Sequence, residues 1–140
     1  MSVVRKPVGG SMGTGSETHR VLVIDDEADI ADSLTDILIL HGYDAVAFHD
    51  GLSAIESARS HCPNIVVSDV VMPKLNGVDT VAAIHEFCPE VRILLLSGQA
   101  LTTDILEKAR ASGHEFEVLP KPIHPYLLIK KISFLMANPT

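Results

Sequence analysis

The sequence contains no tryptophan, and aromatic residues make up only 4% of it. No apolar run approaches the ~18 residues of a membrane-spanning helix, and the first residues lack the apolar centre of a signal peptide. The formal net charge of -7 argues against nonspecific binding to nucleic acid or to an anionic membrane. What remains is a chain of 140 residues, 46% of them hydrophobic, which is enough for one domain with a substantial core.

Strand-like and helix-like segments alternate five times along most of the chain. Residues 1–18 are rich in glycine and serine and predict a flexible leader, so the domain is expected over residues 19–140. The predicted strands are 20–24, 43–48, 65–68, 91–96 and 116–119. The predicted helices are 27–41, a segment from just after Gly51 to before Pro63, 78–87, 102–112 and 125–137.

This alternation predicts right-handed crossovers and a parallel sheet with helices on both faces. Five such units fit an α/β fold, a flavodoxin-like three-layer sandwich with a five-stranded parallel sheet in the order 2-1-3-4-5 and five helices. The switch point of that topology, where ligands bind, lies between the first and third strands.

Polar side chains follow the predicted strands at the points where they end. Asp25 and Asp26 follow the first strand, Asp69 follows the third, and Ser97 and Lys121 follow the fourth and fifth. The carboxyl ends of parallel strands meet at one edge of a sheet, so these groups are expected to converge. Three carboxylates, a hydroxyl and an amine suit a magnesium ion and a phosphoryl group.

The two cysteines, Cys62 and Cys88, each precede a proline and a predicted strand, and neither has metal-ligand spacing. The favoured interpretation is two reduced thiols in connecting loops. The alternative is a redox pair. If the third and fourth strands are neighbours, the two thiols could lie close together, at the end of the sheet opposite the acidic cluster.

Four short motifs, in this order and at strand ends, resemble the receiver domain of two-component response regulators over residues 20 to about 137. They are Val23-Ile24-Asp25-Asp26-Glu27, Asp69-Val70-Val71-Met72-Pro73 with Gly77 behind it, Leu96-Ser97-Gly98, and Lys121-Pro122. The Asp-x-x-Met-Pro-x-x-x-Gly segment is the most specific of them.

The resemblance implies that Asp69 accepts a phosphoryl group from the phosphohistidine of a histidine kinase or a histidine phosphotransfer protein. It implies that Mg²⁺ is bound directly by Asp26, Asp69 and the backbone carbonyl of Val71, and through water by Asp25. Ser97 would hydrogen-bond a phosphoryl oxygen, and Lys121 would pair with Asp69 or with its phosphoryl group. Such a domain is a cytoplasmic signalling switch or relay, and it catalyses only its own phosphorylation and dephosphorylation.

Val118 and Pro120 depart from what is usual in the family, and Pro120 removes one backbone donor from the end of the fifth predicted strand. Val118 stands three residues before the lysine, where a tyrosine or phenylalanine normally turns inward after phosphorylation, so the usual route of output is in doubt. Val71 and Gln99 flank the site at positions where relatives tune hydrolysis of the aspartyl phosphate. Because an apolar side chain does not orient an attacking water, we expect slow self-dephosphorylation.

Three other classes of protein share parts of this pattern. A phosphorylation-independent adaptor with the same fold is favoured slightly by Val118 and disfavoured by the complete set of acids, serine and lysine. A magnesium-dependent phosphohydrolase normally needs a second acid two residues after its nucleophile, and Val71 stands there. A flavin-binding module is disfavoured because the acidic residues at 25–27 would repel its phosphate.

Two surfaces are candidates for partners. Ile39 and Leu40 widen the apolar face of the first helix, which fits partial burial at the helix end or, as the alternative, docking of a kinase or phosphotransfer helix. The helix at 102–112, the strand at 116–119 and the helix at 125–137 form the face through which many relatives dimerise, so a homodimer is one option. Direct binding of nucleic acid or membrane is not expected. A stand-alone receiver and a piece of a longer regulator or hybrid kinase both fit the sequence, which does not name the kinase, the pathway or the output.

Overall fold

The computed structural model describes residues 18–98, 102–111 and 116–137, so the predicted leader lies outside the description except for its last residue. Each predicted segment is present, with ends within one residue of the prediction except at the end of the second helix, which stops at Ser60, short of Pro63. The strands are β1 (Arg20–Ile24), β2 (Asp44–Phe48), β3 (Ile65–Asp69), β4 (Arg92–Ser97) and β5 (Glu117–Pro120). The helices are α1 (Ala28–Leu40), α2 (Gly51–Ser60), α3 (Gly77–Phe87), α4 (Thr102–Ala111) and α5 (Pro125–Ala137).

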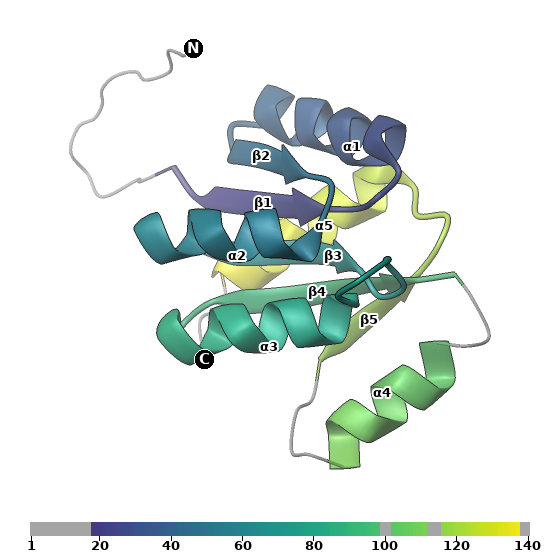
Figure 1. The fold of residues 1–140 in the computed structure, drawn as a ribbon. Helices are drawn as coiled ribbons and strands as arrows, with labels where there is room; N and C mark the ends of the chain where they lie inside the picture. The colour runs from purple at the N-terminus through teal and green to yellow at the C-terminus, as the bar shows by residue number, and fades with distance from the viewer. Residues whose placement is uncertain (1–17, 99–101, 112–115, 138–140) are drawn as a thin grey trace.

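The five strands form one parallel sheet in the order β2-β1-β3-β4-β5, which confirms the predicted fold class (Figure 1). The register pairs Ile24 with both Phe48 and Ser68, and Asp69 with Leu96. The sheet therefore brings the ends of β1, β3 and β4 to the same edge.

Alternate residues of the central strands face opposite sides of the sheet, because side chains of a strand alternate between its faces. Leu22, Val66 and Leu95 point into the cluster that packs against α2, α3 and α4. Val23 and Val67 point into the cluster that packs against α1 and α5. The central strands are buried on both faces, as their unbroken apolar runs predict. Figure 1 shows α2 and α3 in front of the sheet and α5 behind it.

Local signals in the sequence start and stop the helices. The side chain of Asp50 accepts a hydrogen bond from the Ser53 backbone N–H at 2.7 Å and caps α2, and the Asn76 side chain caps α3 through Asp79 at 2.8 Å. Gly42 has a φ of 93°, which allows the chain to turn from α1 into β2. Within the described residues, no helix combines the length and apolar character needed to cross a membrane.

The structure corrects the favoured interpretation of the cysteines. Cys62 and Cys88 form a disulfide instead of two reduced thiols. The physical reason is that β3 and β4 are neighbours in the sheet, so the segments that lead into them run side by side. The Arg92 N–H donates to the Asn64 carbonyl at 2.9 Å, which ties these two segments together next to the disulfide.

Candidate functional site

The acidic cluster lies where the sheet changes winding direction, at the carboxyl ends of β1 and β3. Asp25 follows β1, and its N–H donates to the Phe48 carbonyl of β2 at 3.1 Å. Asp69 is the last residue of β3. One carboxylate oxygen from each of Asp25, Asp26 and Asp69 lies within 4.8 Å of the others. The convergence predicted from the strand ends is therefore present in the structure.

The three carboxylates differ in their surroundings. Asp25 is buried, and both its oxygens have partners: Oδ1 accepts from the Glu27 N–H at 2.9 Å and Oδ2 accepts from Lys121 Nζ at 3.2 Å. Asp26 is exposed, and Asp69 is 9% exposed. Asp26 and Asp69 therefore remain accessible from outside, whereas Asp25 lies behind them and positions Lys121.

Lys121 reaches the cluster from the end of β5. Its Nζ lies 3.5 Å from Asp69 Oδ2, and its backbone N–H donates to the Ser97 carbonyl at 2.9 Å. The Lys121–Pro122 bond is cis. The pairing of Lys121 with Asp25 was not anticipated from the sequence, because nothing in a local pattern specifies which of the carboxylates an amine will contact 96 residues away.

The charges in the site shift the pKa values of both partners. Burial raises the pKa of Asp69 and the Asp25 carboxylate raises it further, while the Lys121 ammonium opposes them and Asp26 adds a smaller repulsion. Burial would lower the pKa of Lys121, but attraction to Asp69 and Asp25 outweighs it, so that pKa is raised. The site therefore holds more negative charge than its one ammonium group neutralises, which favours binding of a cation.

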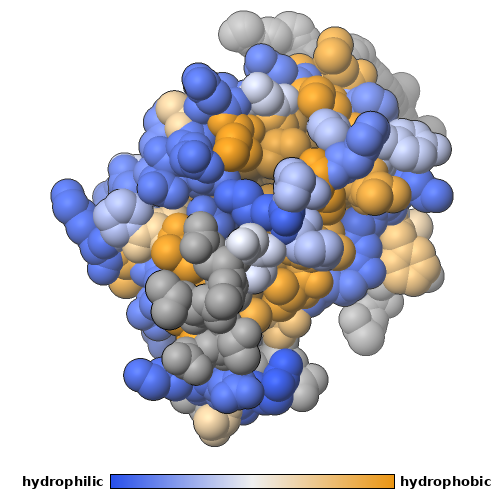
Figure 2. Space-filling view, turned by 90° about the vertical axis from the view of Figure 1, so that its right-hand side faces the viewer, coloured by the Kyte–Doolittle hydropathy of each residue, from blue (hydrophilic) through white to orange (hydrophobic). Residues whose placement is uncertain are grey.

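An open hollow of about 530 Å³ lies over the cluster. Its lining consists of Asp26, Glu27, Asp69, Val71, Gly98, Lys121 and Pro122. Figure 2 faces this end of the molecule and shows hydrophilic residues across its middle, with apolar residues around them. Ser97 ends β4 beside Gly98 and is half-buried, and Val71 is 37% exposed. Gln99, the other residue expected to flank the site, lies outside the described residues.

Two glycines make room around the reacting groups. A Cβ at Gly77 would lie 2.0 Å from the carbonyl oxygen of Asp69, and the Gly77 N–H donates to the Val70 carbonyl at 2.7 Å. The chain after Asp69 thus folds back directly against it, which only glycine permits without a shift of backbone. A Cβ at Gly98 would lie 3.2 Å from the Cβ of Lys121, so that glycine leaves space beside the lysine.

The donor set fits a hard divalent cation. Carboxylate oxygens are the ligands that Mg²⁺ and Ca²⁺ prefer, whereas zinc sites normally contain histidine or cysteine. Among the described residues, this cluster contains neither of those two residue types. Asp25, Asp26 and Asp69 supply the carboxylate oxygens that could hold such an ion, and Asp26 and Asp69 line the hollow.

Val118 lies on the outer strand β5, opposite Leu95 in the register, and is 36% exposed. Nearby, Lys131 of α5 forms an ion pair with Glu117 of β5. These two charges are therefore already paired within the chain.

Two apolar side chains on α1 are largely exposed. Ile39 is 51% exposed and Leu40 is 82% exposed, so most of their surface lies outside the core.

Comparisons with protein families and with known sequences show which proteins this chain resembles. A family model described as the response regulator receiver domain matches residues 21–133. The chain is 29% identical over 103 residues to the chemotaxis protein CheY of Bacillus subtilis (strain 168), which covers 73% of this chain and 86% of that protein. It is 34% identical over 109 residues to the transcriptional regulatory protein PrrA of Mycobacterium bovis, covering 78% of this chain but only 47% of PrrA. The chain thus spans about half the length of PrrA.

Solved structures agree with this result. A response regulator receiver domain protein from Clostridium thermocellum superposes with a TM-score of 0.75 at 26% identity, covering 85% of this chain and 94% of the other. The chemotaxis protein CheY4 of Vibrio cholerae gives a TM-score of 0.74, also at 26% identity, covering 84% and 98%.

Proposed function

This chain belongs to the response regulator receiver domain family, and from that premise we propose that Asp69 accepts a phosphoryl group from a phosphohistidine. The donor would be a histidine kinase or a histidine phosphotransfer protein, and the chain would act as a switch or relay in two-component signalling. The observation that carries this proposal is the position of Asp69, which ends a central strand, lies in a cluster of carboxylates, contacts an ammonium group and borders an open hollow.

The transfer step follows from this geometry. A carboxylate oxygen of Asp69 attacks the phosphorus of phosphohistidine, the P–N bond breaks, and the imidazole leaves and takes up a proton. The product is an acyl phosphate on Asp69. Lys121, 3.5 Å from Asp69 Oδ2, neutralises part of the charge on the phosphoryl oxygens. We assign Ser97, at the end of the neighbouring strand, a hydrogen bond to one of those oxygens.

A magnesium ion held by Asp26, Asp69 and the Val71 carbonyl, with Asp25 acting through water, would neutralise charge on the transferring group. Asp25 suits an indirect role because its two oxygens already accept from Glu27 and Lys121. Its burial behind Asp69 keeps Lys121 directed towards the acceptor. Asp26, which is exposed, suits a direct contact.

Intact-mass measurement after incubation with phosphoramidate tests the proposal. We expect a gain of one phosphoryl group that requires Mg²⁺ and is absent from Asp69→Asn. Asp79→Asn is the matched control, because Asp79 is an exposed carboxylate on the first turn of α3, outside the cluster. A folded protein that binds Mg²⁺ but gains no phosphoryl group would favour the adaptor instead, an alternative that the exposed Val118 in place of an aromatic supports.

Partner docking is a second part of the proposal. Ile39 and Leu40 at the end of α1 offer an apolar surface to a helix of the phosphoryl donor. The face of α4, β5 and α5 is the proposed dimer surface, with one pair of its charges, Glu117 and Lys131, satisfied within the chain. A donor that is itself phosphorylated from ATP implies a cytoplasmic site of action. Sedimentation of the phosphorylated and unphosphorylated protein would test dimerisation. Leu40→Ser tests the docking surface: it should slow transfer from the donor without affecting labelling by phosphoramidate.

A further inference from the structure

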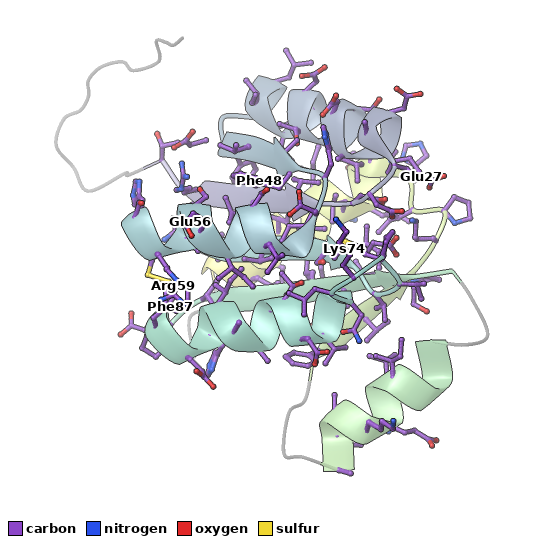
Figure 3. The ribbon with its side chains drawn as sticks, viewed as in Figure 1. Glu27, Phe48, Glu56, Arg59, Lys74 and Phe87 are labelled. Atoms are coloured by element: carbon purple, nitrogen blue, oxygen red, sulfur yellow. A yellow bond between two sulfur atoms is a disulfide. The ribbon has the colours of Figure 1, made fainter. Side chains whose placement is uncertain are left out.

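The disulfide between Cys62 and Cys88 lies at the end of the sheet opposite the acidic cluster. Cys62 follows α2 and precedes β3, and Cys88 caps the C-terminus of α3. Figure 3 shows the sulfur–sulfur bond at the end of α2 and α3, beside Arg59 and Phe87, and far from Glu27 at the acidic end. We propose that this pair is a reversible redox-modification site, which exchanges with dithiol reductants and oxidants of the disulfide class through Cys62. This function is additional to phosphoryl transfer.

The two sulfurs differ in accessibility. Cys62 is exposed, whereas Cys88 is only 3% exposed and belongs to the core cluster between the sheet and α2, α3 and α4. Thiol–disulfide exchange requires an attacking thiolate to reach one sulfur of the bond. The exposed Cys62 provides that access, and the buried Cys88 is the thiol that leaves.

Each sulfur also has a backbone acceptor within reach. Cys62 Sγ lies 3.6 Å from the Phe87 carbonyl oxygen, and Cys88 Sγ lies 3.8 Å from the Ala58 carbonyl oxygen. A disulfide has no S–H to donate, but the thiols formed by reduction do. On reduction the two sulfurs must separate to van der Waals distance, and each thiol would still have a weak hydrogen-bond acceptor beside it, so the buried Cys88 would not become an unsatisfied donor. The surroundings accommodate the reduced state as well as the oxidised one.

Contacts other than the covalent bond also hold the ends of α2 and α3 in place. α2 and α3 contribute Ala54, Ala58, Val81 and Ile84 to the same buried cluster. The Arg59 guanidinium lies 4.8 Å from the centre of the Phe87 ring, a cation–π contact that links the ends of the two helices independently of the sulfurs. Reduction would thus loosen the ends of α2 and α3 and leave the sheet packed.

Reduction of the disulfide by a dithiol proceeds in two exchange steps. A thiolate of a dithiol attacks Cys62 Sγ, the Cys62–Cys88 bond breaks, and Cys88 leaves as a thiolate that takes up a proton. The second thiol of the reductant then attacks the mixed disulfide, which releases Cys62 as a thiol and the reductant as its own disulfide. Two electrons pass from the dithiol to the protein. A receiver whose phosphoryl donor is phosphorylated from ATP works in a compartment whose dithiol systems keep most thiols reduced, so its disulfide would be transient there; only this point rests on the proposed function.

The disulfide also concerns the acidic end of the sheet. It joins the two ends of the segment that contains β3, Asp69 and α3. The bond spans a sequence separation of 26 residues. Opening it gives this segment more freedom in partly unfolded states. We therefore expect the redox state to change the stability of the segment that carries the phosphoryl acceptor.

Alkylation of the folded chain followed by intact-mass measurement tests the proposal. The protein is treated with diamide or with dithiothreitol, without denaturant, and then with N-ethylmaleimide in denaturant after the first reagent is removed. We expect no label after diamide, two labels after dithiothreitol, and interconversion of the two forms over repeated cycles. The melting temperature of the oxidised form should exceed that of the reduced form by roughly 10 °C.

Cys62→Ser is the control, since an exposed serine keeps the fold while removing the disulfide. Its melting temperature should match that of the reduced wild type and should not respond to dithiothreitol. Two labels after diamide, or dimers linked between chains, would overturn the proposal, as would a bond that dithiothreitol cannot open in the folded protein. Phosphoryl gain is read on separate samples, and Asp69→Asn should show the same labelling as the wild type, so failure of the redox site and failure of phosphoryl transfer are distinguishable.

Discussion

Replacement of Gly77 by alanine tests how tightly the segment after Asp69 is built. The added methyl carbon would lie 2.0 Å from the Asp69 carbonyl oxygen, 2.9 Å from its carbonyl carbon and 3.0 Å from the Val70 Cα. All three are backbone atoms, so no side chain can rotate away. Asp69 is itself held in β3 opposite Leu96, and the Val70 N–H donates to the Leu96 carbonyl at 3.1 Å. Relief of the clash must therefore move the start of α3 outward by about 1 Å.

The magnitude follows from the contacts that this movement breaks. Overpacking in a well-packed site costs about 1–3 kcal/mol. The hydrogen bond from the Gly77 N–H to the Val70 carbonyl, 2.7 Å long, would stretch or break, at a cost of about 1 kcal/mol. Alanine gains at most about 1 kcal/mol of helix propensity, and less at the first position of α3. The net loss in free energy of unfolding should be roughly 1–4 kcal/mol, which lowers the melting temperature by several degrees.

Urea unfolding of Gly77→Ala and of a second glycine variant, Gly98→Ala, measures this difference. The Cβ at Gly98 would meet only the Lys121 side chain, at 3.2 Å, which can shift by a few tenths of an ångström. Gly98→Ala should therefore cost less than about 1 kcal/mol. Equal stability of Gly77→Ala and the wild type, or equal losses in the two variants, would refute the inference that the backbone at Asp69 requires glycine at this position.

Three further outcomes are expected. Mg²⁺ should raise the melting temperature, by the equivalent of about 2.7 kcal/mol at a hundred times its dissociation constant, and calorimetry should show that chelation or Asp26→Asn removes this gain. Without Mg²⁺, Asp69 has a raised pKa in the folded state, so its contribution to stability is present below its ordinary pKa of 3.8 and is lost as pH rises through the folded pKa. Asp69→Asn lacks this loss, and its advantage in urea unfolding should grow with pH across that window. Finally, Val71→Asn should shorten the lifetime of the phosphoryl group, measured by loss of the added mass with time, because an amide can orient water where valine cannot; an unchanged or longer lifetime would contradict this role.

The sequence predicted the fold because its signals were local. The unbroken apolar run of β1 required burial on both faces, and the glycine and proline residues between segments marked where helices and strands end. The same pattern placed Asp25, Asp26 and Asp69 at one edge, since the ends of parallel strands meet there. Even the small errors were at boundaries. β5 extends to Pro120, which an outer strand tolerates because its outward side needs no backbone donor.

The details of the site depended on contacts between distant segments. Lys121 and Asp25 pair through long side chains whose directions no periodicity specifies. The sequence favours two reduced thiols over a disulfide, because a pair of cysteines carries no sequence signal that distinguishes neighbouring thiols from bonded ones. The raised pKa of Asp69 likewise depends on burial and on the spacing of three carboxylates, and both are properties of the packed structure.

The two ends of the sheet have opposite effects on the free energy of unfolding. At one end, burial and the neighbouring carboxylates disfavour ionised Asp69 and lower stability in the absence of a cation. At the other end, a bond that closes a separation of 26 residues stabilises the chain by about 3–4 kcal/mol in the loop-entropy account. Both effects act on the segment that contains β3 and α3, so they are coupled through its stability. The reduced protein should therefore depend more on Mg²⁺ to keep this segment folded than the oxidised protein does.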